Sequence, residues 1–148
     1  MKNKQSLSLR SKLGILIILG LLIFSGIAHG YNMFHYPYYE NDEGTYMSQS
    51  WSLITKGKLA PYTYWYDHAP AGWVLIAIWN IITGGFFTFG ASVNSGRVLM
   101  LVLHLFSTAF LYLITKKLSG KSVAGTIAVV FFLAVATCNL FSEKSSAR

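Results

Sequence analysis

The chain has 148 residues, which is about the length of a single domain. Hydrophobic residues make up 53% of it and charged residues 11%, whereas soluble proteins carry roughly 25% charged residues. This composition argues against an ordinary soluble domain and against a disordered chain. The one cysteine, Cys138, excludes an intramolecular disulfide and a multi-cysteine metal site. We therefore expect a membrane protein.

Three apolar runs approach the ~20 residues that a transmembrane helix needs, so we predict an all-α, polytopic membrane protein. Residues 1–12 carry a net charge of +4 and residues 115–121 carry +3. Because Lys and Arg accumulate in short cytoplasmic segments, the amino terminus is predicted to be cytoplasmic and the first loop extracytoplasmic, in the cell membrane. The predicted order is a cytoplasmic tail (1–12), a span (13–30), an extracytoplasmic loop with juxtamembrane helices (31–96), a span (97–114), a cytoplasmic loop (115–121), a span (122–138) and an extracytoplasmic tail (139–148) that we expect to be truncated.

Two alternatives remain open for the topology. The basic start, the apolar run and the sequence Ala28-His29-Gly30 also fit a cleavable signal peptide. A further apolar run, Gly72–Phe89, is a candidate fourth span, but Gly84-Gly85 limits it to a helix of about 13 residues, or ~20 Å. Because the hydrocarbon core is ~30 Å thick, we expect this helix to lie on or dip into the outer membrane surface.

The first loop contains three acids in four positions, Glu40, Asp42 and Glu43. A helix is predicted from Glu43 to Lys56, with Asn41 or Asp42 as its N-cap and Gly57 as a left-handed C-cap. Met47, Trp51 and Ile54 are placed on one face of that helix. In one interpretation the acids only cap and solvate the helix. In the other they form a site at the membrane surface, where an ionised carboxylate can act as a base.

A second cluster in the loop combines aromatic residues with Asp67 and His68, followed by Pro70 at the start of the next helix. Asp67 can orient the ring of His68. The alternative is an aromatic belt at the membrane interface with a polar turn. A divalent metal held by His68 and the acids stays open, although tight ligand spacing is missing, and no other cofactor is predicted. His104, within a predicted span, is expected to pack against a neighbouring helix, with a proton relay as the alternative.

The order of these motifs resembles the amino-terminal part of GT-C membrane glycosyltransferases. The resemblance is to family 39, the dolichyl-phosphate-mannose protein mannosyltransferase type, which includes bacterial aminoarabinose transferase-like enzymes. It covers roughly residues 10–141. The motifs that carry it are Asp42-Glu43-Gly44-x-Tyr46, Lys58-Leu59-x-Pro61-Tyr62, Tyr66-Asp67-His68-Ala69-Pro70, Arg97 before a span and a Lys-Lys-Leu-x-Gly loop.

The resemblance implies an enzyme several times longer than this chain, which would be its amino-terminal fragment and inactive alone. Such an enzyme transfers a sugar from a polyprenyl-phosphate donor to an acceptor lipid, glycan or protein on the outer face, with inversion. It implies Asp42 as general base. The family often has His-Pro-Pro or Lys-Pro-Pro where this chain has His68-Ala69-Pro70.

Further substrate-binding roles are expected for Glu43, Tyr46, Asp67, His68 and Arg97. Arg97 is expected either near a lipid phosphate or as an anchor that snorkels to the membrane interface. The alternative to an enzyme is a small three-span structural or assembly subunit whose aromatic loop docks a partner.

Overall fold

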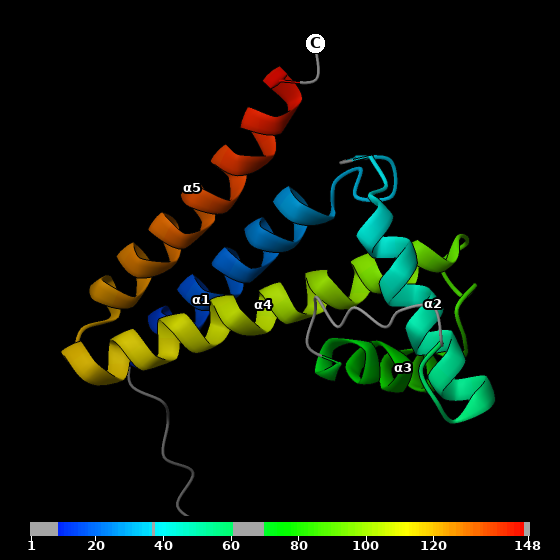
Figure 1. Cartoon of the computed structure of the whole chain (residues 1–148). Coiled ribbons are helices and arrows are strands. Elements are labelled where there is room, and N and C mark those ends of the chain that lie inside the picture. Colours follow the sequence, from blue (N-terminus) through cyan, green and yellow to red (C-terminus); the bar gives the residue numbers. More distant parts are fainter. Residues whose placement is uncertain (1–8, 37, 61–69, 147–148) are drawn as a thin grey trace, which may run out of the picture. The chain divides into compact units, whose positions relative to one another are not determined.

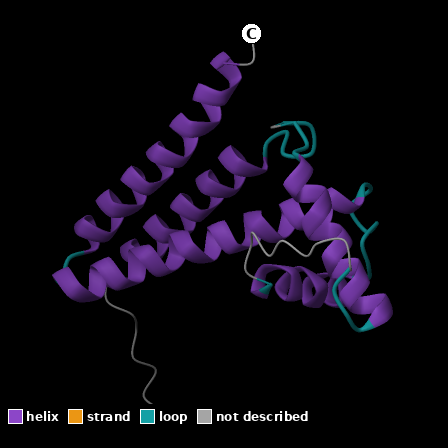
Figure 2. Cartoon of the chain, in the orientation of Figure 1, coloured by secondary structure: helices purple, strands orange, loops and turns teal. Residues whose placement is uncertain are grey.

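The computed structural model of the chain describes residues 9–36, 38–60 and 70–146, with side chains described for 12–36, 38–40, 42–60 and 70–135. The described residues form an all-α structure, as predicted (Figures 1 and 2). The helices are α1 (Leu9–Gly30), α2 (Asn41–Lys56), α3 (Ala71–Thr83), α4 (Ser92–Ser119) and α5 (Ser122–Ser146).

The chain divides into two compact units. The first unit consists of Met1–Tyr31 and Leu103–Arg148, and therefore holds α1, most of α4 and α5. The second unit, Asn32–Val102, holds α2, α3 and the first turns of α4.

Two helices within the described residues are long and apolar enough to cross a membrane, Lys12–Gly30 and Ser92–Ser119. Large apolar side chains of α1 point outward, for example Leu16 and Ile27, each 65% exposed. Small polar residues such as Ser25 and Thr108 are fully buried in the same unit. Exposed apolar and buried polar side chains are expected where lipid rather than water surrounds a helix. In α5 the apolar stretch that the structure describes, Ser122–Val135, is shorter than a span, so the third span stays a prediction.

The core of the first unit is built around Tyr112 of α4, which is 1% exposed and packs with Val129 and Leu133 of α5. The Tyr112 hydroxyl donates a hydrogen bond to the backbone oxygen of Gly14 in α1, at 3.3 Å. Gly125 brings α5 against this tyrosine, because a Cβ there would lie only 2.9 Å from the Tyr112 backbone oxygen. Small residues allow this close approach of apolar helices.

His104 contacts two aromatic rings of the first unit. Its ring stacks on Phe132 of α5 with 5.1 Å between the centroids. The centroid of the His29 ring of α1 lies 4.1 Å from that of His104. The expectation that His104 packs against a neighbouring helix is confirmed.

In the second unit α2 packs against α3 through a face that is largely polar. Gln49, Ser50 and Ser52 of α2 are buried, whereas Trp51 and Ile54 are exposed. Ser50 donates a hydrogen bond to the backbone oxygen of Trp73 at 2.9 Å, and Ser52 donates one to that of Lys58 at 2.8 Å. The face shared by Met47, Trp51 and Ile54 is therefore buried only at Met47.

Glycines end the helices of the second unit where the sequence predicts them to end. Gly57 closes α2 with φ 65°, the predicted left-handed cap. Gly84 and Gly85, at φ 91° and 123°, end α3 after 13 residues, so the predicted short helix is confirmed. Pro70 precedes α3 in a helical conformation, and its backbone oxygen accepts the first helical hydrogen bond, from Val74 at 3.1 Å.

The bounds of the last two helices differ from the prediction. α4 begins at Ser92, so Arg97 lies in its second turn instead of opening it, and the helix continues to Ser119. The predicted cytoplasmic loop, 115–121, is thus helical except for Gly120 and Lys121. α5 continues to Ser146, beyond the predicted end at residue 138. Hydropathy locates the apolar part of a helix and misses its polar end turns.

Candidate functional site

The acids of the first loop begin α2. The helix starts at Asn41, two residues earlier than predicted, and its N-cap is Glu40. Assigning the cap to Asn41 or Asp42 was wrong, because Glu43 at position N3 reaches back to the backbone. Its Oε2 accepts a hydrogen bond from the N–H of Glu40 at 3.2 Å, as in a capping box.

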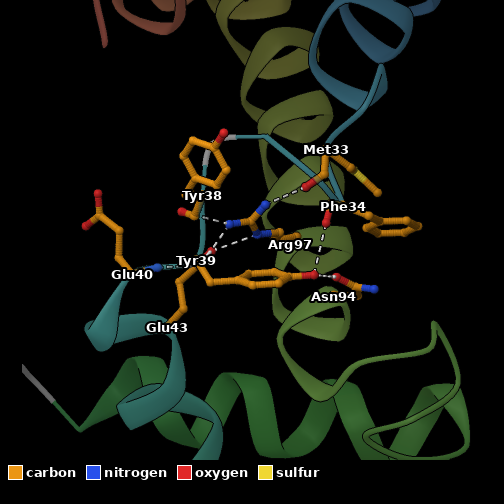
Figure 3. Close-up of polar contacts among 8 residues, drawn as sticks. All are labelled: Met33, Phe34, Tyr38, Tyr39, Glu40, Glu43, Asn94 and Arg97. Carbon is orange, nitrogen blue, oxygen red and sulfur yellow. Dashed lines mark hydrogen bonds and ion pairs between the residues drawn. The ribbon is translucent and has the colours of Figure 1, made fainter. Parts of the chain in front are cut away.

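Arg97 of α4 forms a bidentate ion pair with the carboxylate of Glu43. Nε of Arg97 donates to Oε1 at 2.9 Å, and Nη2 donates to Oε2 at 2.8 Å (Figure 3). The Arg97 side chain is 9% exposed and that of Glu43 31% exposed. A bidentate pair shielded from water is stronger than a surface ion pair, so it fixes the start of α2 to α4.

The same guanidinium binds the segment that precedes α2. Nη1 donates to the backbone oxygen of Met33 at 2.7 Å, and Nη2 lies 3.4 Å from that of Tyr38 (Figure 3). The Tyr39 ring covers the guanidinium, with 4.6 Å between Cζ and the ring centroid. Arg97 therefore joins three parts of the second unit: α4, α2 and residues 33–39.

The hydroxyl of Tyr39 reinforces this arrangement. It lies 2.9 Å from the backbone oxygen of Phe34 and 3.1 Å from Oδ1 of Asn94, so its one proton is shared between two acceptors. The amide of Asn94 in turn donates to the backbone oxygen of Phe89 at 2.9 Å. Asn94 is buried in the first turn of α4. An apolar residue at this position would leave the groups that its amide contacts without these hydrogen bonds.

A pocket of about 250 Å³ opens beside this network, entirely within the second unit. Its walls are mostly apolar, and the two acids in the first turn of α2 are among the lining residues. The lining residues are Asp42, Glu43, Tyr46, Met47, Ile76, Val93, Gly96 and Met100. Asp42 is exposed. Tyr46 packs edge to face on buried Trp73 with 6.2 Å between the ring centroids, which sets its position at the pocket.

The two acids at the pocket differ in exposure, since Glu43 is partly buried and Asp42 is exposed. Both oxygens of Glu43 accept hydrogen bonds from Arg97, and one also accepts from the Glu40 backbone. Glu43 is thereby committed to structure and its charge is balanced. Asp42, the next residue along the helix, is exposed where it lines the pocket. Asp42 is therefore the more solvent-accessible of the two acids at the pocket.

The structure brings together four of the six predicted site residues: Asp42, Glu43 and Tyr46 at the pocket, and Arg97 behind Glu43. Asp67 and His68 lie outside the described residues. The hydrogen bonds of the Arg97 guanidinium that the structure describes go to protein groups, and its predicted place near a lipid phosphate or at the membrane interface stays a prediction.

Sequence reasoning missed the supporting residues Met33, Tyr39 and Asn94. Met33 contributes only a backbone oxygen, which leaves no signal in the sequence. Tyr39 and Asn94 are 55 positions apart, and only the folded chain brings them together. Among the described side chains, no group of three or more His, Cys, Asp or Glu is placed to hold a metal ion.

No known protein family, curated protein or solved structure matches the chain.

Proposed function

We propose that this chain is the amino-terminal part of an integral-membrane glycosyltransferase. It moves a sugar from a polyprenyl-phosphate donor to an acceptor hydroxyl on the extracytoplasmic side, with Asp42 as general base. The observation that supports the proposal is the placement of the two acids at an apolar-walled pocket. Glu43 is held by Arg97, whereas exposed Asp42 lines an apolar-walled pocket beside Tyr46.

The proposed step uses one base and one leaving group. Asp42 removes the proton of the acceptor hydroxyl, whose oxygen forms a bond to C1 of the sugar. The bond between C1 and the phosphate oxygen breaks, and the lipid phosphate leaves with the bonding electrons. Attack from the face opposite the phosphate inverts C1. A positioned base of this kind contributes typically 10²–10⁴-fold, on the order of 3–5 kcal/mol.

The apolar surroundings of the pocket suit a lipid-linked donor. Its walls include Ile76 of α3 and Val93 and Met100 of α4, a helix long and apolar enough to cross a membrane. α3 also presents an apolar outer face, with Ile81 and Ile82 exposed, as expected for a helix at the membrane surface. Both features would place the donor's polyprenyl chain in lipid and its sugar at the acids.

Arg97 has a positioning role in this proposal. By binding Glu43 and the backbone at Met33, it orients the first turn of α2 and hence Asp42. Charge on the departing phosphate must then be stabilised by other groups. Glu43, the N3 residue of the capping box, holds the first turn of α2, which contains Asp42.

The test compares Asp42→Asn with Glu43→Gln in the full-length protein that contains this chain. Asp42→Asn removes basicity and retains size, so we expect at least about a 100-fold loss of sugar transfer with unchanged thermal stability. Glu43→Gln should instead lower thermal stability, because it leaves Arg97 without its ionic partner. Transfer is measured with polyprenyl-phosphate sugar in membranes, and stability by thermal aggregation in detergent.

Near wild-type transfer by Asp42→Asn would contradict the assignment of the base. Normal transfer by both variants would favour the interpretation in which the acids only begin α2, and with it a structural subunit. Full stability of Glu43→Gln would show that the ion pair does not hold α2.

A further inference from the structure

A second groove lies in the first unit, between the start of α1 and the start of α5. Its volume is about 380 Å³. The wall consists of apolar side chains together with the hydroxyls of Ser122 and Thr126. The lining residues are Leu13, Gly14, Ile17, Ser122, Val123, Thr126 and Ile127. All of them belong to the unit that contains α1, α5 and the carboxyl-terminal part of α4, so the groove is independent of the pocket at Asp42.

Lys116 of α4 places its amine at one side of this groove. Its Nζ lies 3.3 Å from the position that a Cβ on Gly14 would occupy, and Gly14 lines the groove. The amine is also 5.7 Å from the centroid of the buried Tyr112 ring. Because Gly14 has no side chain, α1 leaves room there for the long side chain of Lys116, which is half-buried.

The charge around the groove is of one sign. Residues 1–31 and 103–142 contain no Asp or Glu, so the unit's one acid is Glu143, more than 20 positions along α5 from Ser122. Lys12 directly precedes the groove residue Leu13, and Lys121 directly precedes Ser122. The first turn of α5 contains no acid, and the N–H groups of a helix's first turn attract anions.

We propose that this groove binds an anionic phospholipid from the leaflet that faces the amino terminus. One acyl chain lies along the apolar wall formed by Leu13, Ile17 and Ile127, and the phosphate lies at Lys116. Basic pockets between membrane helices on the cytoplasmic side are suited to acidic headgroups. A soluble anion would use the lysines but not the apolar wall, whereas a neutral lipid would use the wall but not the lysines. The proposal does not depend on sugar transfer.

Native mass spectrometry of the whole chain in detergent tests the charge requirement. The probes are phosphatidylglycerol and phosphatidylcholine with identical acyl chains. One basic residue near an acidic lipid surface changes affinity by about fivefold, and we expect that loss of phosphatidylglycerol binding in Lys116→Gln. The matched control is Lys117→Gln, the same change on the exposed neighbour, which should stay within about twofold of wild type because its charge lies off the groove.

A second pair of variants tests the apolar wall. Thr126→Leu adds volume inside the groove and should weaken the binding of both phospholipids. Val130→Leu, on the exposed face of α5, should change the binding of neither. Glycerol 3-phosphate, which has the headgroup without acyl chains, should not compete at equal concentration. Equal binding of the two phospholipids, equal effects of Lys116→Gln and Lys117→Gln, or full competition by glycerol 3-phosphate would each overturn the proposal.

Discussion

A single guanidinium, that of Arg97, holds the candidate site in place. An arginine presents five N–H donors in a planar fork, and those of Arg97 contact a carboxylate and backbone oxygens while its face lies against the Tyr39 ring. A lysine has a point charge and no plane, so it cannot make the bidentate pair or the stacked contact. The geometry of the site therefore requires arginine at this position.

We expect Arg97→Lys to loosen the segment before α2 although the charge is kept. Losing hydrogen bonds to a charged group costs about 1.5–3 kcal/mol. Hydrogen exchange should become faster in the peptide covering residues 33–40, and the thermal midpoint in detergent should fall. Lys58→Arg, an exchange of cations at an exposed position of the same unit, is the control and should change neither.

A double variant separates this network from general destabilisation. If Arg97 acts through Glu43, adding Glu43→Gln to Arg97→Lys should cost less than the sum of the two single changes. Strict additivity, or unchanged exchange in residues 33–40, would show that the contact does not order this segment.

Part of the candidate site can be predicted from the sequence alone. Asp42 and Glu43 are neighbours at a helix start, and their acidity and spacing are visible directly. The link from Glu43 to Arg97 crosses 54 positions, and it depends on where α4 begins. Because the sequence predicts Arg97 at the outer end of a transmembrane helix, the environment expected from the sequence is lipid headgroups and not protein.

The helices themselves differ in how well local signals define them. α3 ends where Gly84 and Gly85 adopt positive φ, which side chains disfavour, and that signal is local. The start of α4 is polar, and Ser95 is satisfied by a hydrogen bond to Oδ1 of Asn80 at 2.8 Å. Such long-range partners allow a polar turn to be buried, so apolar periodicity alone placed the helix start too late.

The close approach of α5 to Tyr112 gives a stability prediction. Gly125→Ala puts a Cβ 2.9 Å from the Tyr112 backbone oxygen and 2.9 Å from its Cδ2, and backbone cannot move aside cheaply. Overpacking of this kind costs about 1–3 kcal/mol, so the thermal midpoint in detergent should fall. The measurement is thermal aggregation followed by size-exclusion chromatography.

Gly20→Ala in α1 is the matched control, because nothing lies within 4 Å of its added Cβ. A glycine-to-alanine change inside a helix favours the helix by up to about 1 kcal/mol, so this variant should be as stable as wild type or more stable. A Gly125→Ala protein as stable as Gly20→Ala would contradict the tight packing at Tyr112.

For the molecule as a whole, the distribution of side chains supports a lipid environment. In the first unit apolar groups such as Ile23 and Phe131 are exposed, whereas Ser25 and Thr108 are buried. Cations concentrate at the start of α1 and around the turn from α4 to α5, and four of the five acids belong to the second unit. This charge pattern is visible in the sequence, and it predicts that the carboxyl-terminal end of α4 faces the cytoplasm.

Labelling from the two sides of the membrane tests that orientation. α4 has 28 residues, and at 1.5 Å per residue it extends about 42 Å, more than the ~30 Å hydrocarbon core. In a Cys138→Ser background, a cysteine at Ala91 should react with a membrane-impermeant maleimide added outside cells. A cysteine at exposed Lys117 should react only after the membrane is permeabilised, since it would face the cytoplasm. Reaction of both from outside would show that α4 does not cross, and reaction of Lys117→Cys alone would invert the topology and place Asp42 on the cytoplasmic side.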